Sequence, residues 1–205
     1  MYSMNDTIEV AGGESVIYFD TVVHSMIHMY QKITQLKVLE HFFQHPSETF
    51  YLRELARLLS MSPMTVKRTL DMLITDNLIV KTSSKGRILY TANVESHSFR
   101  YLKVAHNLAA MEHEGIPRRL LESVHGISSA VLYGSHARGD NDEHSDIDIL
   151  VISVTGHAPQ EKIPGVNVIA MNATKWAEIA RTNRAFYLDV ITEGIVLHGT
   201  RPVVE

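Results

Sequence analysis

Residues 129–152 read SAVLYGSHARGDNDEHSDIDILVI, and this stretch decides the fold of the second half of the chain. It opens with a short apolar run that predicts a strand, and Gly134-Ser135 follows that run at once. Ten residues later the chain enters a second β-like run, which carries Asp146 and Asp148. The pattern is therefore a strand, Gly-Ser, a polar segment and a strand with Asp-x-Asp.

Each part of this pattern has a chemical use. Alternate residues of a strand point to the same face, so Asp146 and Asp148 share a face while the isoleucines after them enter the core. Their Cα atoms lie about 6.6–7 Å apart, so both carboxylates can converge on a hard cation such as Mg²⁺. Gly134 lets the backbone approach closely, and Ser135 offers a hydroxyl and an N–H for a phosphate where a helical turn starts.

The segment between residues 140 and 148 is strongly acidic. It contains no lysine or arginine, and a bound metal would invert its sign and recruit a nucleoside triphosphate. Its five acids are Asp140, Asp142, Glu143, Asp146 and Asp148.

The pattern resembles the minimal nucleotidyltransferases of the DNA polymerase β-type superfamily, over about residues 128–199. The resemblance implies an α/β fold with a mixed sheet and metal-dependent transfer of an NMP from an NTP to a hydroxyl. By position, Gly134, Ser135 and Arg138 would bind the triphosphate. Asp146 and Asp148 would be the catalytic residues and would hold Mg²⁺ or Mn²⁺. Some members modify a partner toxin, so a protein acceptor is compatible with the resemblance.

The chain departs from the family at its third carboxylate. That residue lies on a following strand, here Gly165–Ala170, and the matching position is Asn167. An amide carries no charge and cannot act as a general base. Two hypotheses therefore remain open: an active nucleotidyltransferase, or a regulator whose impaired nucleotidyltransferase fold senses or only retains a nucleotide.

The first half of the chain shows helical spacing of apolar residues in three segments. Ser62 reads as the N-cap of the third helix, and Pro63 as its first residue. Two β-like runs, Leu78–Thr82 and Arg87–Thr91, follow and are joined by Ser83-Ser84-Lys85-Gly86, which indicates a hairpin. The three helical segments are Ile33–Phe43, Tyr51–Leu59 and Pro63–Ile74.

This order resembles a winged helix-turn-helix. The resemblance implies that the third helix enters the major groove of double-stranded DNA, that the hairpin touches the backbone or minor groove, and that the protein is a homodimer. Residues 60–90 carry five bases and two acids, a local charge of +3 within a chain of net charge −4. The candidate DNA contacts are Thr65, Lys67, Arg68, Lys85 and Arg87; a solvated helix face and hairpin tip is the alternative.

The expected fold class is α+β in three parts. Residues 1–32 form an extension with a helix over Ser15–Met29, residues 33–97 a winged helix-turn-helix, and residues 98–205 a nucleotidyltransferase-like α/β domain that starts with a helical linker. Such a protein would combine transcription regulation with nucleotide chemistry.

Composition narrows the classes further. The chain has 205 residues, 45% of them hydrophobic, and its apolar runs are too short to span a bilayer. Its start lacks the basic region of a signal peptide, and it has no cysteine, which excludes disulfides and thiolate zinc sites. We therefore expect a cytoplasmic protein without membrane partners. The pairs His24/His28 and His41/His45 have i, i+4 spacing but no third ligand, and we interpret them as core or surface histidines.

Overall fold

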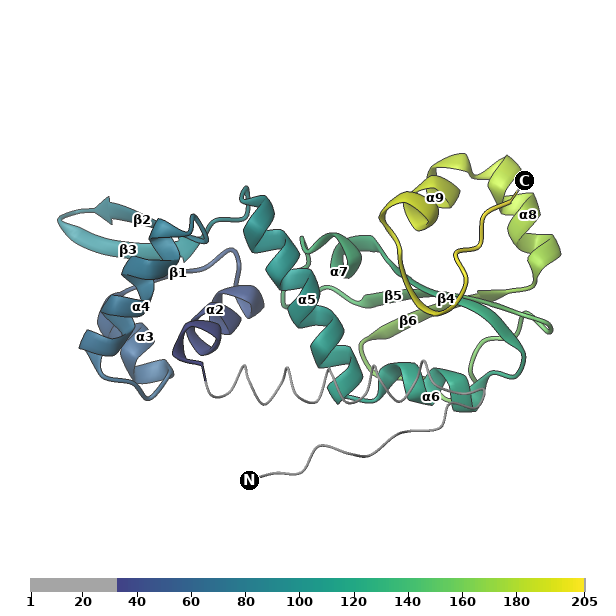
Figure 1. Ribbon diagram of the computed structural model, residues 1–205, viewed down its shortest axis with the longest axis horizontal. Coiled ribbons are helices and arrows are strands. Elements are labelled where there is room, and N and C mark those ends of the chain that lie inside the picture. Colours follow the sequence, from purple (N-terminus) through teal and green to yellow (C-terminus); the bar gives the residue numbers. More distant parts are fainter. Residues whose placement is uncertain (1–32, 205) are drawn as a thin grey trace, which may run out of the picture.

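The computed structural model describes residues 33–204 as two packed bodies joined by one long helix (Figure 1). The expected helix over Ser15–Met29 and the pair His24/His28 lie outside the described residues.

The first body contains three helices and a hairpin in the order that the sequence predicts, and a short strand between the first two helices, which the sequence does not predict, joins the hairpin in a small antiparallel sheet. The sheet order is β1-β3-β2, and apolar side chains from all three helices, such as Phe42, Leu55 and Leu70, are fully buried between helices and sheet. The elements are α2 (Thr34–Gln44), β1 (Thr49–Phe50), α3 (Leu52–Leu58), α4 (Pro63–Thr75), β2 (Ile79–Ser84) and β3 (Arg87–Ala92).

The start of α4 follows directly from its sequence. Oγ of Ser62 accepts a hydrogen bond from the backbone N–H of Thr65 at 3.1 Å, and Pro63 occupies the first helical position. The cap satisfies one of the N–H groups that the first turn leaves unpaired, while proline has no N–H to satisfy there.

The hairpin turn is shorter than the sequence predicts. Strand pairing continues to Ser84 and Arg87, so the loop contains Lys85 and Gly86 alone. Both have positive φ, 50° and 75°, which is the backbone of a type I′ turn. That turn matches the right-handed twist of the paired strands, which explains why Ser83 and Ser84 pair instead of forming the loop.

The second body is built on a four-stranded mixed sheet of order β6-β5-β4-β7. Strands β5 and β6 are parallel, and the pairs β4–β5 and β4–β7 are antiparallel. Its elements are α5 (His97–His113), α6 (Ile116–Ser123), β4 (Ile127–Tyr133), α7 (Gly134–Arg138), β5 (Ile147–Ser153), β6 (Val166–Met171), α8 (Ala173–Thr182), α9 (Arg184–Leu188), the π-helical turn η1 (Asp189–Glu193) and β7 (Ile195–Gly199).

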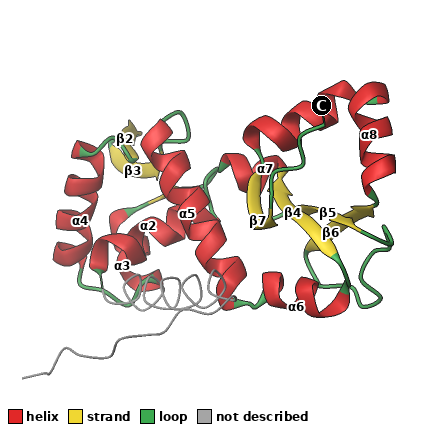
Figure 2. Ribbon diagram, turned by 45° about the vertical axis from the view of Figure 1, so that its right-hand side comes forward, coloured by secondary structure: helices red, strands yellow, loops and turns green. Residues whose placement is uncertain are grey.

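Helices cover both faces of this sheet, as Figures 1 and 2 show. On one face Leu132 and Ile149 pack with Leu120 of α6. On the other, Val131 and Leu150 pack with α8 and α9, including Trp176 and Tyr187. The alternation of strand side chains therefore serves two cores, and β4 and β5 are buried on both sides.

Helix α5 belongs to both bodies. Phe99, in its first turn, is part of the core of the first body, and Met111, in its last turn, is part of the core of the second. The segment expected as a helical linker is therefore a packed element. No helix between residues 33 and 204 combines the length and the apolar character that crossing a membrane requires.

Candidate functional site

Three neighbouring strands bring the residues of the Gly-Ser and Asp-x-Asp pattern together. Tyr133, the last residue of β4, pairs with Asp148 of β5, and Asp148 pairs with Asn167 of β6. Gly134 comes directly after Tyr133. The row therefore places the Gly-Ser turn, the carboxylate of Asp148 and the side chain of Asn167 at the same end of three neighbouring strands. Asn167 stands at the position of the family's third carboxylate.

Gly134 stands close against this row, and a side chain at its position would displace the Asp148 carboxylate. A Cβ at this position would lie 2.8 Å from Oδ2 of Asp148, and the residue has φ +71°, which L side chains rarely adopt. Glycine therefore answers both a steric and a conformational demand here. It leaves the space beside the Asp148 carboxylate open, and Ser135, half-buried in the first turn of α7, lies next to it.

Asn167 contacts Asp148 directly. Its amide Nδ2 donates a hydrogen bond to Oδ1 of Asp148 at 2.9 Å. In the family pattern a third carboxylate at this place would repel Asp148 unless a cation lay between them. The amide instead stabilises the carboxylate without any metal, which shows how this departure is accommodated.

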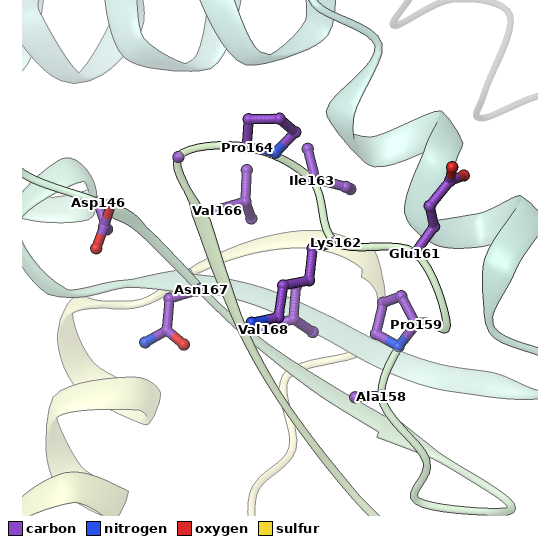
Figure 3. Close-up of a pocket in the computed structure, with 11 residues that line it drawn as sticks. Asp146, Ala158, Pro159, Glu161, Lys162, Ile163, Pro164, Val166, Asn167 and Val168 are labelled. Atoms are coloured by element: carbon purple, nitrogen blue, oxygen red, sulfur yellow. The ribbon is translucent and has the colours of Figure 1, made fainter.

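Asp146 lies just before β5, not inside it, and is exposed. The sequence predicts that it belongs to the strand, but pairing of β5 begins at Ile147. Asp146 and Asn167 lie near each other at one end of a cavity of about 450 Å³, with Glu161 farther along the same cavity (Figure 3). The cavity runs under the segment between β5 and β6, and Lys162 projects into its middle (Figure 3).

Arg138 is held at the end of α7 by two carboxylates. Its guanidinium lies 3.2 Å from Oδ2 of Asp140 and 3.2 Å from Oδ1 of Asp189. Asp189 is a residue that the sequence analysis missed, although it is an acid within the apolar stretch Phe186–Val190 and could have been noticed there. The pair fixes Arg138 beside the site, and a triphosphate would have to compete with both acids for it.

The five acids of the loop do not act together as one cluster. Asp142 accepts hydrogen bonds from the backbone N–H of His144 at 3.0 Å and from Oγ of Ser145 at 2.7 Å, and these bonds lower its pKa. Asp140 pairs with Arg138, and Glu143 contacts His45. Among the residues that the structure describes, Asp142, Asp146 and Asp148 are the loop's acids without an ion pair, and Asp142 is already hydrogen-bonded within the loop.

A buried polar network beneath the loop ties it to α5. Lys103 is 1% exposed and donates to the backbone carbonyl of Asn141. Asn107, one turn on, donates to Oδ1 of Asn141 at 2.8 Å and to the carbonyl of His136 at 3.0 Å. Phe99, Lys103 and Asn107 lie four residues apart, so they share the buried face of α5. The sequence signal for this network was the presence of polar residues at the spacing of that buried face.

Burial shifts the proton equilibria of the groups around the site. It lowers the pKa of Lys103 to about 8, against the attraction of Asp142 and Asp140. It also lowers the pKa of His136, against a backbone hydrogen bond with Asp146. Burial raises the pKa of Tyr133 to about 12, and Asp148 and Asp189 add to that effect. Tyr133 is therefore protonated at neutral pH and is no general base.

The five residues predicted to contact DNA are all exposed on the first body. The Oγ1 atom of Thr65 lies 2.8 Å from Oγ of Ser62, and Lys67 forms an ion pair of 2.7 Å with Asp71. Arg68 has no ion pair within the described part of the chain, and the same holds for Lys85 and Arg87 on the hairpin. These three cations are the most available to a phosphate.

Residues 114–194 match the family model of the nucleotidyltransferase domain. A nucleotidyltransferase domain is therefore present, and the matched segment contains Gly134, Ser135, Asp146, Asp148 and Asn167. No curated protein matches the chain in sequence.

Two solved structures show a distant similarity. Rv1404 from Mycobacterium tuberculosis is 17% identical, with 54% of this chain and 84% of that chain covered and a TM-score of 0.34. The apo form of a ZitR mutant from Lactococcus lactis is 15% identical, with 54% and 81% covered and a TM-score of 0.32. Both scores are low.

Proposed function

We propose that residues 98–205 transfer an NMP from an NTP to a hydroxyl acceptor with the help of Mg²⁺ or Mn²⁺. The observation that carries this proposal is the row across β4, β5 and β6. It sets Asp148 against the side-chain-free Gly134 within a nucleotidyltransferase domain. Two carboxylates without ion pairs at one sheet edge fit the oxygen ligands that these cations prefer.

Each residue has a distinct part in this proposal. Asp146 and Asp148 would hold the cations, which neutralise charge on the phosphates when bound. The backbone at Gly134 and the hydroxyl of Ser135 would orient the triphosphate, and Arg138 would contact it from the end of α7. Because phosphoryl-type transfer depends mainly on positioning and charge, Asn167 would slow the reaction without abolishing it.

We also propose that residues 33–97 form a winged helix-turn-helix that binds double-stranded DNA as part of a homodimer. Helix α4 would enter the major groove, with Arg68 and Thr65 toward the bases and phosphates. The hairpin would place Lys85 and Arg87 on the backbone. The exposed, unpaired cations on both elements support this proposal.

A second candidate is a transcriptional regulator that senses a nucleotide without turning it over. The hydrogen bond from Asn167 to Asp148 favours it, because an uncharged amide replaces a ligand and a base at the same place. Under this candidate the site binds NTP with Mg²⁺ and transfers nothing.

The proposed transfer activity can be tested by incubating the protein with each of the four radiolabelled NTPs and Mg²⁺ in a cell extract that supplies acceptors. We expect labelled product with the wild type and at least a hundredfold less with Asp146→Asn or Asp148→Asn. Glu161→Gln, at the other end of the cavity, is the matched control and should label like the wild type. Equal labelling by all four proteins would refute the proposal.

Binding separates the two candidates. Trp176 is 2% exposed and does not line the site, so its intrinsic fluorescence would report nucleotide binding poorly. A fluorescent NTP analogue is therefore used to measure binding. Binding that needs Mg²⁺ and both aspartates, without any labelled product, would favour the sensor over the enzyme.

A further inference from the structure

A second group of metal-ligating side chains lies where the two bodies meet. His45, at the end of α2, places Nδ1 2.9 Å from Oε2 of Glu143 and 3.4 Å from Oε1 of Glu48. All three ligand atoms lie within 4.8 Å of one another. Glu143 belongs to the acidic loop of the second body and stands 98 positions from His45, so sequence spacing gave no sign of this arrangement.

The charges at this place favour a cation. Two carboxylates approach the same imidazole nitrogen, which can donate only one proton between them. The side chains are 33%, 41% and 51% exposed for His45, Glu143 and Glu48, so a dissolved ion can reach them. An imidazole nitrogen with two carboxylate oxygens is a donor set for Zn²⁺ and similar first-row divalent metals, which take ligands at about 2.0–2.2 Å.

A cavity beside the group supplies a second, independent observation. It has a volume of about 480 Å³ and is lined by His45 and Glu143 together with His136. His136 is 9% exposed, and its Nδ1 is buried without a hydrogen-bond partner. A buried imidazole nitrogen without a hydrogen-bond partner is unfavourable, and an ordered water molecule is the usual way to satisfy such a group. The cavity thus has room for the water molecules that would complete the coordination of a metal.

We propose that His45, Glu48 and Glu143 bind one divalent transition-metal ion that fastens α2 to the acidic loop. Glu143 lies three residues before Asp146, so the metal would fix the loop next to the proposed Mg²⁺ ligands. This site is separate from the nucleotidyltransferase site and shares no ligand with it. Its occupancy would link the position of the first body to the geometry of the second.

Calorimetric titration of the full chain with Zn²⁺, at saturating Mg²⁺ so that Asp146 and Asp148 are occupied, tests the proposal. We expect one Zn²⁺ per chain and an affinity at least about tenfold weaker in His45→Gln and in Glu143→Gln, because loss of even an outer-shell partner has that effect. The exposed His125→Gln and Glu161→Gln are the matched controls and should bind like the wild type. Co²⁺ absorption reports the coordination in the same proteins.

Other outcomes would overturn it. Absence of Zn²⁺ binding by the wild type would do so, as would unchanged affinity in both ligand variants. Loss of binding in Asp146→Asn/Asp148→Asn, with retention in His45→Gln, would place the metal in the nucleotidyltransferase site instead. Circular dichroism without metal confirms that each variant is folded. Because labelling by NTP is not part of the readout, failure here leaves the nucleotidyltransferase proposal intact, and the reverse also holds.

Discussion

Asn167 is the residue at which this chain differs most from the pattern it resembles. Its amide satisfies Asp148 through a 2.9 Å hydrogen bond, so the row of polar groups is stable without a cation. A carboxylate at the same place would need a metal to hold it beside Asp148. The amide therefore leaves this position without a negative charge and without a general base, and it pairs with Asp148 directly.

We expect Asn167→Asp to raise the rate of NMP transfer roughly hundredfold, since a positioned general base contributes on that order. Without Mg²⁺ the variant should be less stable by about 1 kcal/mol, because a hydrogen bond is replaced by two like charges. Saturating Mg²⁺ should remove that difference. Labelling rates and urea unfolding with and without Mg²⁺ measure both effects.

Asn172→Asp is the matched control for this change. Asn172 caps α8, where its Oδ1 accepts from the N–H of Lys175 at 2.9 Å, and aspartate caps a helix equally well. It should alter neither transfer nor the Mg²⁺ dependence of stability. A labelling rate of Asn167→Asp no higher than that of the wild type would contradict the role assigned to position 167.

At this scale the sequence identifies residues that share a short pattern and misses those that meet through folding. Asp148 and Gly134 follow from the strand, Gly-Ser and strand pattern, and the position of Asn167 follows from the resemblance to the nucleotidyltransferase family. Asp189 lies 51 positions from Arg138 and Glu143 lies 98 from His45, so only the fold brings these pairs together. In the sequence, Lys103 has the character of an exposed surface lysine. Only the packing of α5 against the second body shows that it is buried.

Elements are predicted well where one local rule decides them. Ser62 and Pro63 fix the start of α4, and Gly115 with Pro117 separates α5 from α6. The predicted start of the hairpin turn is wrong by two residues. Serines are typical of loops, but Ser83 and Ser84 pair with the neighbouring strand through backbone hydrogen bonds. Pairing across strands is a non-local effect, so composition alone places the ends of a hairpin poorly.

The buried ammonium of Lys103 makes α5 sensitive to alkaline pH. In the folded protein its pKa is lowered to about 8, while in the unfolded chain it has the ordinary value of 10.5. Between these values the unfolded chain binds more protons, so the free energy of unfolding rises with pH. Below about 8 both states are protonated, and the unfavourable burial of the charge is fully present and constant.

We therefore expect the wild type to gain stability relative to Lys103→Met as pH rises from about 8 to 10.5, by up to about 1.4 kcal/mol per pH unit. Urea unfolding of both proteins across this range measures the difference, and subtracting the variant removes the tyrosines, which titrate in both. Lys81→Met, an exposed lysine on β2, should follow the wild-type curve. Parallel curves for wild type and Lys103→Met would contradict the assignment.

The whole molecule separates two kinds of charge. Residues 33–97 contain eight lysines and arginines and six acids, whereas residues 98–205 contain ten and thirteen. The net charge of −4 therefore hides a basic first body, and α5 joins it to an acidic second one. Figure 1 shows the hairpin of β2 and β3 at one end of the molecule and α6 toward the other. A polyanion would approach the end with the hairpin and α4.

Binding to a DNA duplex tests this separation at the scale of the whole protein. We expect the affinity for a 30-base-pair fluorescent duplex to fall as the salt concentration rises. Arg68→Ala and Lys85→Ala should each make the slope of log K against log salt less negative by about 1. Arg118→Ala, which removes one positive charge from α6, keeps the same net charge as either variant and should retain the wild-type slope. Fluorescence anisotropy at several salt concentrations gives all four slopes. If all three variants lose affinity equally, net charge and not the α4–hairpin surface governs binding. An affinity that does not change with salt concentration would exclude the proposed phosphate contacts.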